Sequence, residues 1–155
     1  MNLTRILTAG AVLACAVLAA PAAKADTTST SSLTVSSSIP AKPTSTSTLE
    51  ALTVSGTVNI VASAIIDPAG GPTTVVYYID GYDTAKISGA SGAYRHTLQA
   101  NIERQLTVNG ADTLVFTVPA ISSAGAARTL QVTATVQMNT TTLALQSASL
   151  SFAAF

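Results

Sequence analysis

The chain has 155 residues, of which only 9% are charged and 5% are aromatic, and it has no tryptophan. That length is enough for one domain with a sizeable core, but ordinary soluble domains carry about 25% charged residues. Serine and threonine fill the polar positions instead, which fits an extracellular or periplasmic β protein better than a cytosolic enzyme. Seven basic and seven acidic residues leave no basic excess, so we expect no nucleic-acid binding.

Residues 1–25 have the three parts of a secretory signal peptide. Arg5 gives a positive start, residues 6–20 are apolar, and Ala23-Lys24-Ala25 forms a small-x-small cleavage site. We therefore predict a secreted protein in the periplasm, at the cell surface or outside the cell. Cleavage before Asp26 removes two basic residues and no acid, so the mature net charge becomes −2. The apolar run is too short for a membrane helix, so we expect no transmembrane segment after cleavage.

Cys15 lies inside the apolar part of this leader. The simplest interpretation is a small apolar residue. The alternative is a lipidated cysteine after Val12-Leu13-Ala14, as in bacterial lipoproteins. If cleavage follows Ala25, the mature chain has no cysteine and forms no disulfide, although its compartment permits them.

Residues 26–48 form a Ser/Thr-rich N-terminal arm or linker that contains Pro40 and Pro43. One part of this segment has apolar side chains at alternate positions, with a serine continuing the same face. The four residues of that face are Leu33, Val35, Ser37 and Ile39. They fit either a short edge strand or an extended arm that docks on another chain.

Residues 49–155 are predicted to form one β-sandwich domain. Residues 50–66 alternate between apolar and polar side chains, with Gly56 as a weak point or a bulge. Proline and glycine then break the chain at residues 67–72. Residues 73–80 are apolar on both faces, which is typical of a central strand, and residues 85–88 suit a short edge strand.

Residues 93–118 contain two alternating runs that meet at Asn109-Gly110. Asn-Gly between alternating runs predicts a β-hairpin, because both residues tolerate the positive φ of a type I′ turn. A helix is the alternative, with one face made of Tyr94, Leu98, Ile102 and Leu106. This helix does not explain why the remaining alternate positions of the run are also apolar or partly apolar, so we prefer the strand.

The last two runs complete the predicted fold. Residues 129–138 have the cleanest alternation in the chain, while the apolar phase slips within residues 143–155. A bulge near Gln146-Ser147 would restore that phase. Seven to eight short strands without a convincing helix predict an all-β protein, an antiparallel two-sheet β-sandwich of immunoglobulin-like type.

Residues with catalytic or metal-binding chemistry are sparse. His96 is the single histidine and has no nucleophile motif beside it, so an inward-facing core residue is the simpler interpretation. Asp67, Asp80 and Asp83 lie in predicted turns and lack the regular spacing of a calcium loop. We therefore predict no enzyme, no catalytic residues, no metal and no cofactor.

A signal peptide, an alternating arm and a charge-poor sandwich together resemble a bacterial fimbrial subunit of the chaperone–usher type. The resemblance implies a structural or adhesive subunit of an extracellular assembly that associates with itself or other secreted subunits by β-strand addition. It also implies that Leu33, Val35, Ser37 and Ile39 contact the partner. The alternative is a monomeric binding module for a carbohydrate or surface ligand. Its contacts would be Tyr77, Tyr78, Tyr82 and Tyr94.

Overall fold

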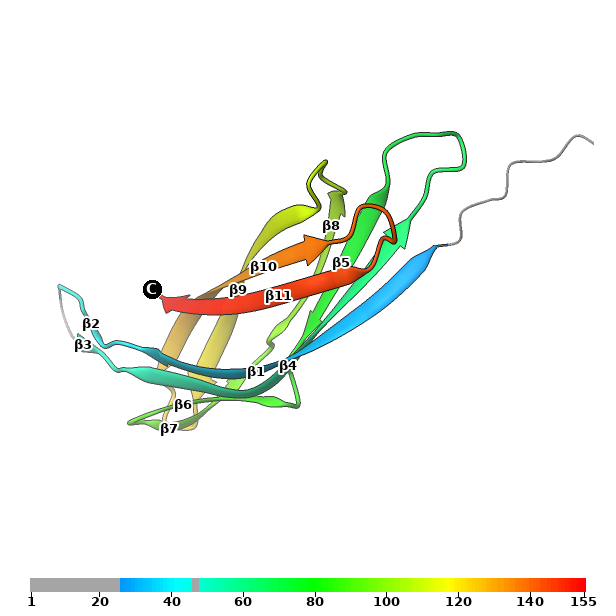
Figure 1. Ribbon diagram of the computed structural model, residues 1–155. Helices are drawn as coiled ribbons and strands as arrows, with labels where there is room; N and C mark the ends of the chain where they lie inside the picture. The colour runs from blue at the N-terminus through cyan, green and yellow to red at the C-terminus, as the bar shows by residue number, and fades with distance from the viewer. Residues whose placement is uncertain (1–25, 46–47) are drawn as a thin grey trace, which may run out of the picture.

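The computed structural model describes residues 26–45 and 48–155, and all regular elements in that part of the chain are β-strands (Figure 1). They are β1 (Thr27–Ile39), β2 (Lys42–Pro43), β3 (Thr48–Leu49), β4 (Leu52–Ile65), β5 (Thr74–Asp80), β6 (Ala85–Gly89), β7 (Gly92–His96), β8 (Gln99–Gln105), β9 (Ala111–Ser122), β10 (Ala127–Met138) and β11 (Leu145–Ala154). The prediction of an all-β, antiparallel protein is confirmed. The predicted signal peptide, with Cys15, lies outside the described residues.

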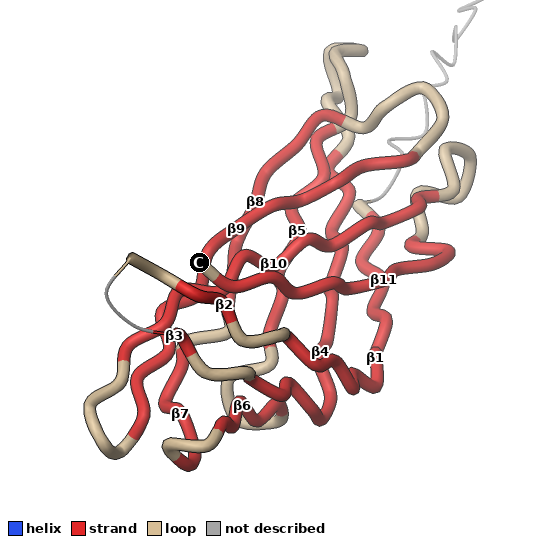
Figure 2. The backbone as a smooth tube through the Cα atoms, turned by 90° about the vertical axis from the view of Figure 1, so that its left-hand side faces the viewer, coloured by secondary structure: helices blue, strands red, loops and turns tan. Residues whose placement is uncertain are grey.

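Nine strands form one continuous sheet in the order β11-β10-β9-β7-β6-β4-β5-β8, with β1 paired to β4. The long strand β4 changes partner along one edge, from β6 in its first half to β5 in its second half, while β1 lies along its other edge. The sheet folds over, so that β1, β4, β5 and β8 face β9, β10 and β11 (Figures 1 and 2). The arrangement is sandwich-like, but neither an immunoglobulin-like topology nor the predicted number of strands is confirmed.

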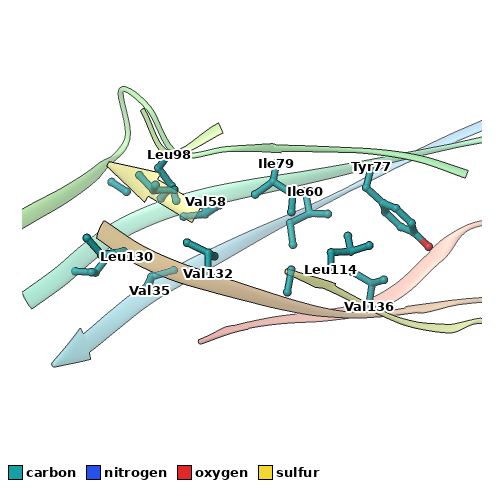
Figure 3. Close-up of a cluster of buried hydrophobic side chains, with 14 of the residues drawn as sticks. Val35, Val58, Ile60, Tyr77, Ile79, Leu98, Leu114, Leu130, Val132 and Val136 are labelled. Carbon is teal, nitrogen blue, oxygen red and sulfur yellow. The ribbon is translucent and has the colours of Figure 1, made fainter. Parts of the chain in front are cut away.

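The core lies between these two layers, where the inward positions of the alternating runs meet (Figure 3). Ile60 on β4 and Tyr77 and Ile79 on β5 face Leu114 on β9 and Val132 on β10. All five side chains are at most 1% exposed. The strand pattern predicted for residues 129–138 is confirmed, because every inward side chain of β10 from position 130 to 138 is buried.

The predicted hairpin at Asn109-Gly110 is wrong. The run before it is split into β7 and β8, and β8 pairs with β5, whereas β9 pairs with β10 and β7. In the turn only Gly110 has a positive φ, of 73°, so the type I′ geometry is not formed. Asn109 Oδ1 instead accepts a hydrogen bond from the backbone of Ala111 at 3.1 Å, and Met138 N donates to Gly110 O at 2.8 Å. The turn carries the chain between layers because β8 and β9 each find a different partner.

The predicted bulge near the start of the last strand is confirmed. Met138 pairs with Leu145 and Gln137 pairs with Ser147, so Gln146 is the extra residue on β11. After this bulge the even positions of β11 face inward, as the half-buried Ala148, Leu150 and Phe152 show. One inserted residue therefore turns the apolar face of the second half of the strand toward the core.

Candidate functional site

Strand β1 contains the predicted arm residues. It pairs with β4 over its whole length of 13 residues, from Thr27 opposite Ala64 to Ile39 opposite Leu52. Val35 and Ile39 are 8% and 3% exposed, and the other two residues of that face are half-buried. All four predicted contact residues therefore lie on one face of β1, which in this structure packs against the core of the same chain.

The outward face of β1 is held to β4 by short polar side chains. Ser32 Oγ donates a hydrogen bond to Asn59 Oδ1 at 2.7 Å, and the hydroxyls of Thr28 and Ser63 lie 3.2 Å apart. These two pairs join opposed positions of the ladder, so they support its register. The residues are not charged, and the pairing therefore does not depend on ionic strength in the way that a salt bridge does.

The other edge of β1 runs beside β11 without a ladder between the two strands in the described sheet. At one end Leu145 N donates a hydrogen bond to Ser29 Oγ at 2.7 Å. Farther along, residues 33–37 of β1 and 148–152 of β11 line a groove of about 440 Å³. The two strands run in the same direction (Figures 1 and 2). Along the side where the two strands face each other, their backbone groups are therefore directed toward this groove and not into a ladder.

Both strands of this edge lack the features that usually protect edge strands. Neither β1 nor β11 contains a charged residue or a proline. The edge strand β8, in contrast, carries Glu103 and Arg104, both exposed. Natural proteins place charges and prolines on edge strands to prevent pairing with other chains. Besides the neighbouring strand across the groove, the bulge at Gln146, near one end of β11, is the protective feature that this edge has.

Glu50 fixes the segment that connects β1 to β4. Its carboxylate accepts hydrogen bonds from Ser91 N at 2.7 Å and from the Tyr94 hydroxyl. Its carbonyl oxygen accepts a hydrogen bond from the guanidinium of Arg128, which is only 4% exposed. Within residues 26–45 and 48–155, Nε and Nη2 of Arg128 have no hydrogen-bond partner. Two separate segments, the β6–β7 hairpin and β10, thus hold one residue of the connection.

The same contacts change the acidity of two side chains. The hydrogen bonds from Tyr94 and Ser91 hold the pKa of Glu50 below its ordinary value, because they favour the charged carboxylate. Burial raises the pKa of Tyr94, and the hydrogen bond to Glu50 raises it further. Glu50 therefore stabilises the folded chain most when its carboxylate is ionised.

Replacing Glu50 with glutamine is expected to lower the thermal unfolding midpoint at neutral pH. The pKa of Glu50 is lowered in the folded chain, so its contribution is present above the ordinary value of 4.5 and is lost as the pH falls through the folded value. The difference between the variant and the parent should shrink in melting curves recorded well below pH 4.5. Glu103→Gln, on β8, is the control and should show no such trend. A constant difference at every pH would contradict the assignment.

The four tyrosines predicted as ligand contacts do not form one site. Tyr77 is 1% exposed in the core, where burial and the charge of Asp112 raise its pKa to about 12. Tyr94 is 5% exposed and bound to Glu50. Tyr78 and Tyr82 are exposed, but the hydroxyl of Tyr78 accepts a hydrogen bond from Gln99 on β8. Tyr82 lines a surface cleft beside β7 and β9.

A cleft of about 490 Å³ lies beside the short ladder between β7 and β9. Tyr82 and Arg95 contribute side chains from one side, and Pro119, Ile121 and Ser123 line the other. Sequence reasoning named Tyr82 as a ligand contact and considered His96 singly, but it did not bring the lining residues together, because they come from distant parts of the chain. Arg95, a charged residue in a charge-poor chain, was one indication available in the sequence.

His96 also borders this cleft, but both of its ring nitrogens have backbone partners. Its Nε2 donates to Ala85 O at 3.1 Å, and Nδ1 accepts a hydrogen bond from Leu98 N at 3.3 Å. Through these two hydrogen bonds the ring stabilises the turn between β7 and β8. Among the described residues, no three His, Cys, Asp or Glu side chains gather as metal ligands would. That part of the chain also contains no helix with the length and hydrophobicity to cross a membrane.

Comparisons with known proteins add no assignment, since no family model, curated protein or solved structure matches this chain.

Proposed function

We propose that this protein is a secreted structural subunit that associates with other copies of itself by β-strand addition, with β1 as the exchanged strand. The observation that carries the proposal is the pair of facing edges of β1 and β11, which no ladder joins. Two strands without charge or proline lie beside a groove, and each has one side free of a ladder in the described sheet. Such edges pair readily with another chain.

Exchange of β1 between copies has a low energetic cost. The contacts that β1 makes with β4 in its own chain are available, in the same register, on β4 of a second copy. Because β1 is the first described strand and lies at an edge, it leaves the sheet without threading through another segment. The balance between monomer and assembly then depends on protein concentration and on the connection that Glu50 holds.

Cysteine pairs test this exchange, because the mature chain has no cysteine of its own. Ser32 and Asn59 are opposed on β1 and β4, and opposed positions of an antiparallel ladder lie within disulfide range. Mass-labelled Ser32→Cys and Asn59→Cys chains are mixed, incubated at high concentration and oxidised. We expect a disulfide between the two chains. Thr133→Cys mixed with Ser151→Cys is the matched control on β10 and β11, and should form far fewer such links.

A second variant distinguishes exchange from simple collision. Ser32→Cys and Asn59→Cys in one chain should close within that chain and keep β1 on its own β4. We expect oxidation to abolish the oligomers or fibres that light scattering and negative-stain microscopy detect, and reduction to restore them. The proposal is wrong if the parent chain stays monomeric at all concentrations, or if the oxidised variant assembles as the parent does.

A further inference from the structure

The cleft beside β7 is an independent candidate for ligand binding. Strand β7 is labelled in the lower part of Figure 1. Its volume of about 490 Å³ is within the range of about 300–1,000 Å³ that is usual for small-molecule sites. It extends along the β7–β9 ladder, which runs from Tyr94 opposite Ser122 to His96 opposite Ala120. Thr97 and Pro119 line it beyond one end of that ladder, and Ser123 and Gly125 line it beyond the other. Pro119 has no N–H with which to extend the ladder.

The charge of the cleft lining is positive. Arg95 is exposed, and it is the only Asp, Glu, Lys or Arg among the residues that line the cleft. Its guanidinium forms no ion pair or hydrogen bond with any residue in the described segments. An arginine without a partner beside a cleft without acids suits a carboxylate, because its planar fork can donate two parallel hydrogen bonds.

The walls of the cleft suit a ring that is apolar on one face and polar at its margin. Tyr82 and Ile121 are 48% and 53% exposed, which leaves a large apolar surface uncovered. Thr97 and Ser123 add hydroxyl groups at the rim. The carbon face of a sugar ring packs against such aromatic and aliphatic side chains by dispersion, while its hydroxyls form hydrogen bonds with the rim.

We infer that the cleft binds an acidic sugar, with the ring on Tyr82 and Ile121 and the carboxylate on Arg95. The chemical class of the ligand is a six-membered sugar ring that carries a carboxylate, as in a uronic acid. This inference does not depend on strand exchange, because the cleft lies on β7, β9 and the turn after β5, and not on β1 or β11.

Trigalacturonate, with neutral galactotriose as its matched control, is the probe for this site. In NMR titrations of the mature chain, trigalacturonate should shift the resonances of Tyr82 and Arg95. Its Kd should be at least several-fold lower than the Kd of the neutral sugar. Arg95→Gln and Tyr82→Ala should each weaken binding about tenfold, the effect of losing one charged hydrogen-bonded or stacking contact. Arg104→Gln and Tyr78→Ala, which remove an exposed arginine and an exposed tyrosine elsewhere, should bind as the parent does.

Three results would overturn the inference. One is the absence of any shift with trigalacturonate. Another is equal binding of the acidic and neutral sugars. The third is binding that survives both Arg95→Gln and Tyr82→Ala. Because the site residues are exposed, these variants should fold, and amide spectra of each variant will show that they do.

Discussion

Gly56→Ala is expected to lower the free energy of unfolding by roughly 3 kcal/mol or more, since strain and overpacking add. Gly56 has a φ of 122°, a conformation that side-chain-bearing residues rarely adopt. A Cβ at this position would lie directly against the carbonyl oxygen of Thr84 and 2.9 Å from Cα of Ala85. Both obstacles are backbone, so no side-chain rotation relieves the clash. Denaturant unfolding followed by circular dichroism measures the loss.

Gly70→Ala separates the two causes of this effect. Gly70 also has a positive φ, of 82°, but a Cβ there would meet nothing within 4 Å. This variant should lower the free energy of unfolding only by the backbone strain, about 1–2 kcal/mol. The difference between the two variants then reports the close approach of β4 to the turn before β6. Equal losses would show that Gly56 matters for its backbone conformation alone.

Ile39→Asp is expected to detach β1 from the sheet and to cost roughly 3 kcal/mol or more, because it buries a carboxylate without a partner. Ile39 is 3% exposed and opposes Leu52, which is 1% exposed. The chain can avoid burying the charge only by releasing this end of β1. Hydrogen exchange should then show faster exchange of the amides that join β1 to β4. Denaturant unfolding gives the free energy.

Val108→Asp is the matched control, because Val108 is 101% exposed in the turn after β8. It should change the free energy of unfolding by less than about 0.5 kcal/mol. The pair also bears on the proposed assembly. An exchanged β1 must place the same residue against Leu52 of the second copy, so Ile39→Asp should reduce association as well. Unchanged protection of the β1 amides in Ile39→Asp would contradict the burial of this residue.

Local alternation was sufficient to predict most of the strands. Successive side chains of a strand point to opposite faces, so a period of two is visible in any run with one buried face. The strands at residues 52–65 and 127–138 follow this rule, and the phase slip at Gln146 indicated the bulge. The same reasoning placed Leu33, Val35, Ser37 and Ile39 on one face of a strand.

The choice of partners was not visible in the same pattern. Alternation shows that a face is buried, but it does not show which strand lies beside it. For this reason the Asn109-Gly110 turn was assigned to a hairpin, although β8 and β9 pair with other strands. Tyr77 and Tyr94 were taken as surface contacts for the same reason, because their burial depends on segments distant in the chain.

Sequence patterns alone predicted a charge-poor β protein, the positions of most strands and an N-terminal segment with one apolar face. Only the tertiary structure showed that this strand lies on β4, that its free edge meets β11, and that Glu50 joins Ser91, Tyr94 and Arg128. The difference lies in the distance along the chain over which each feature is set. Side-chain alternation and backbone turns are set by neighbours in the chain, whereas an edge, a groove or a buried polar cluster exists only after distant strands have packed.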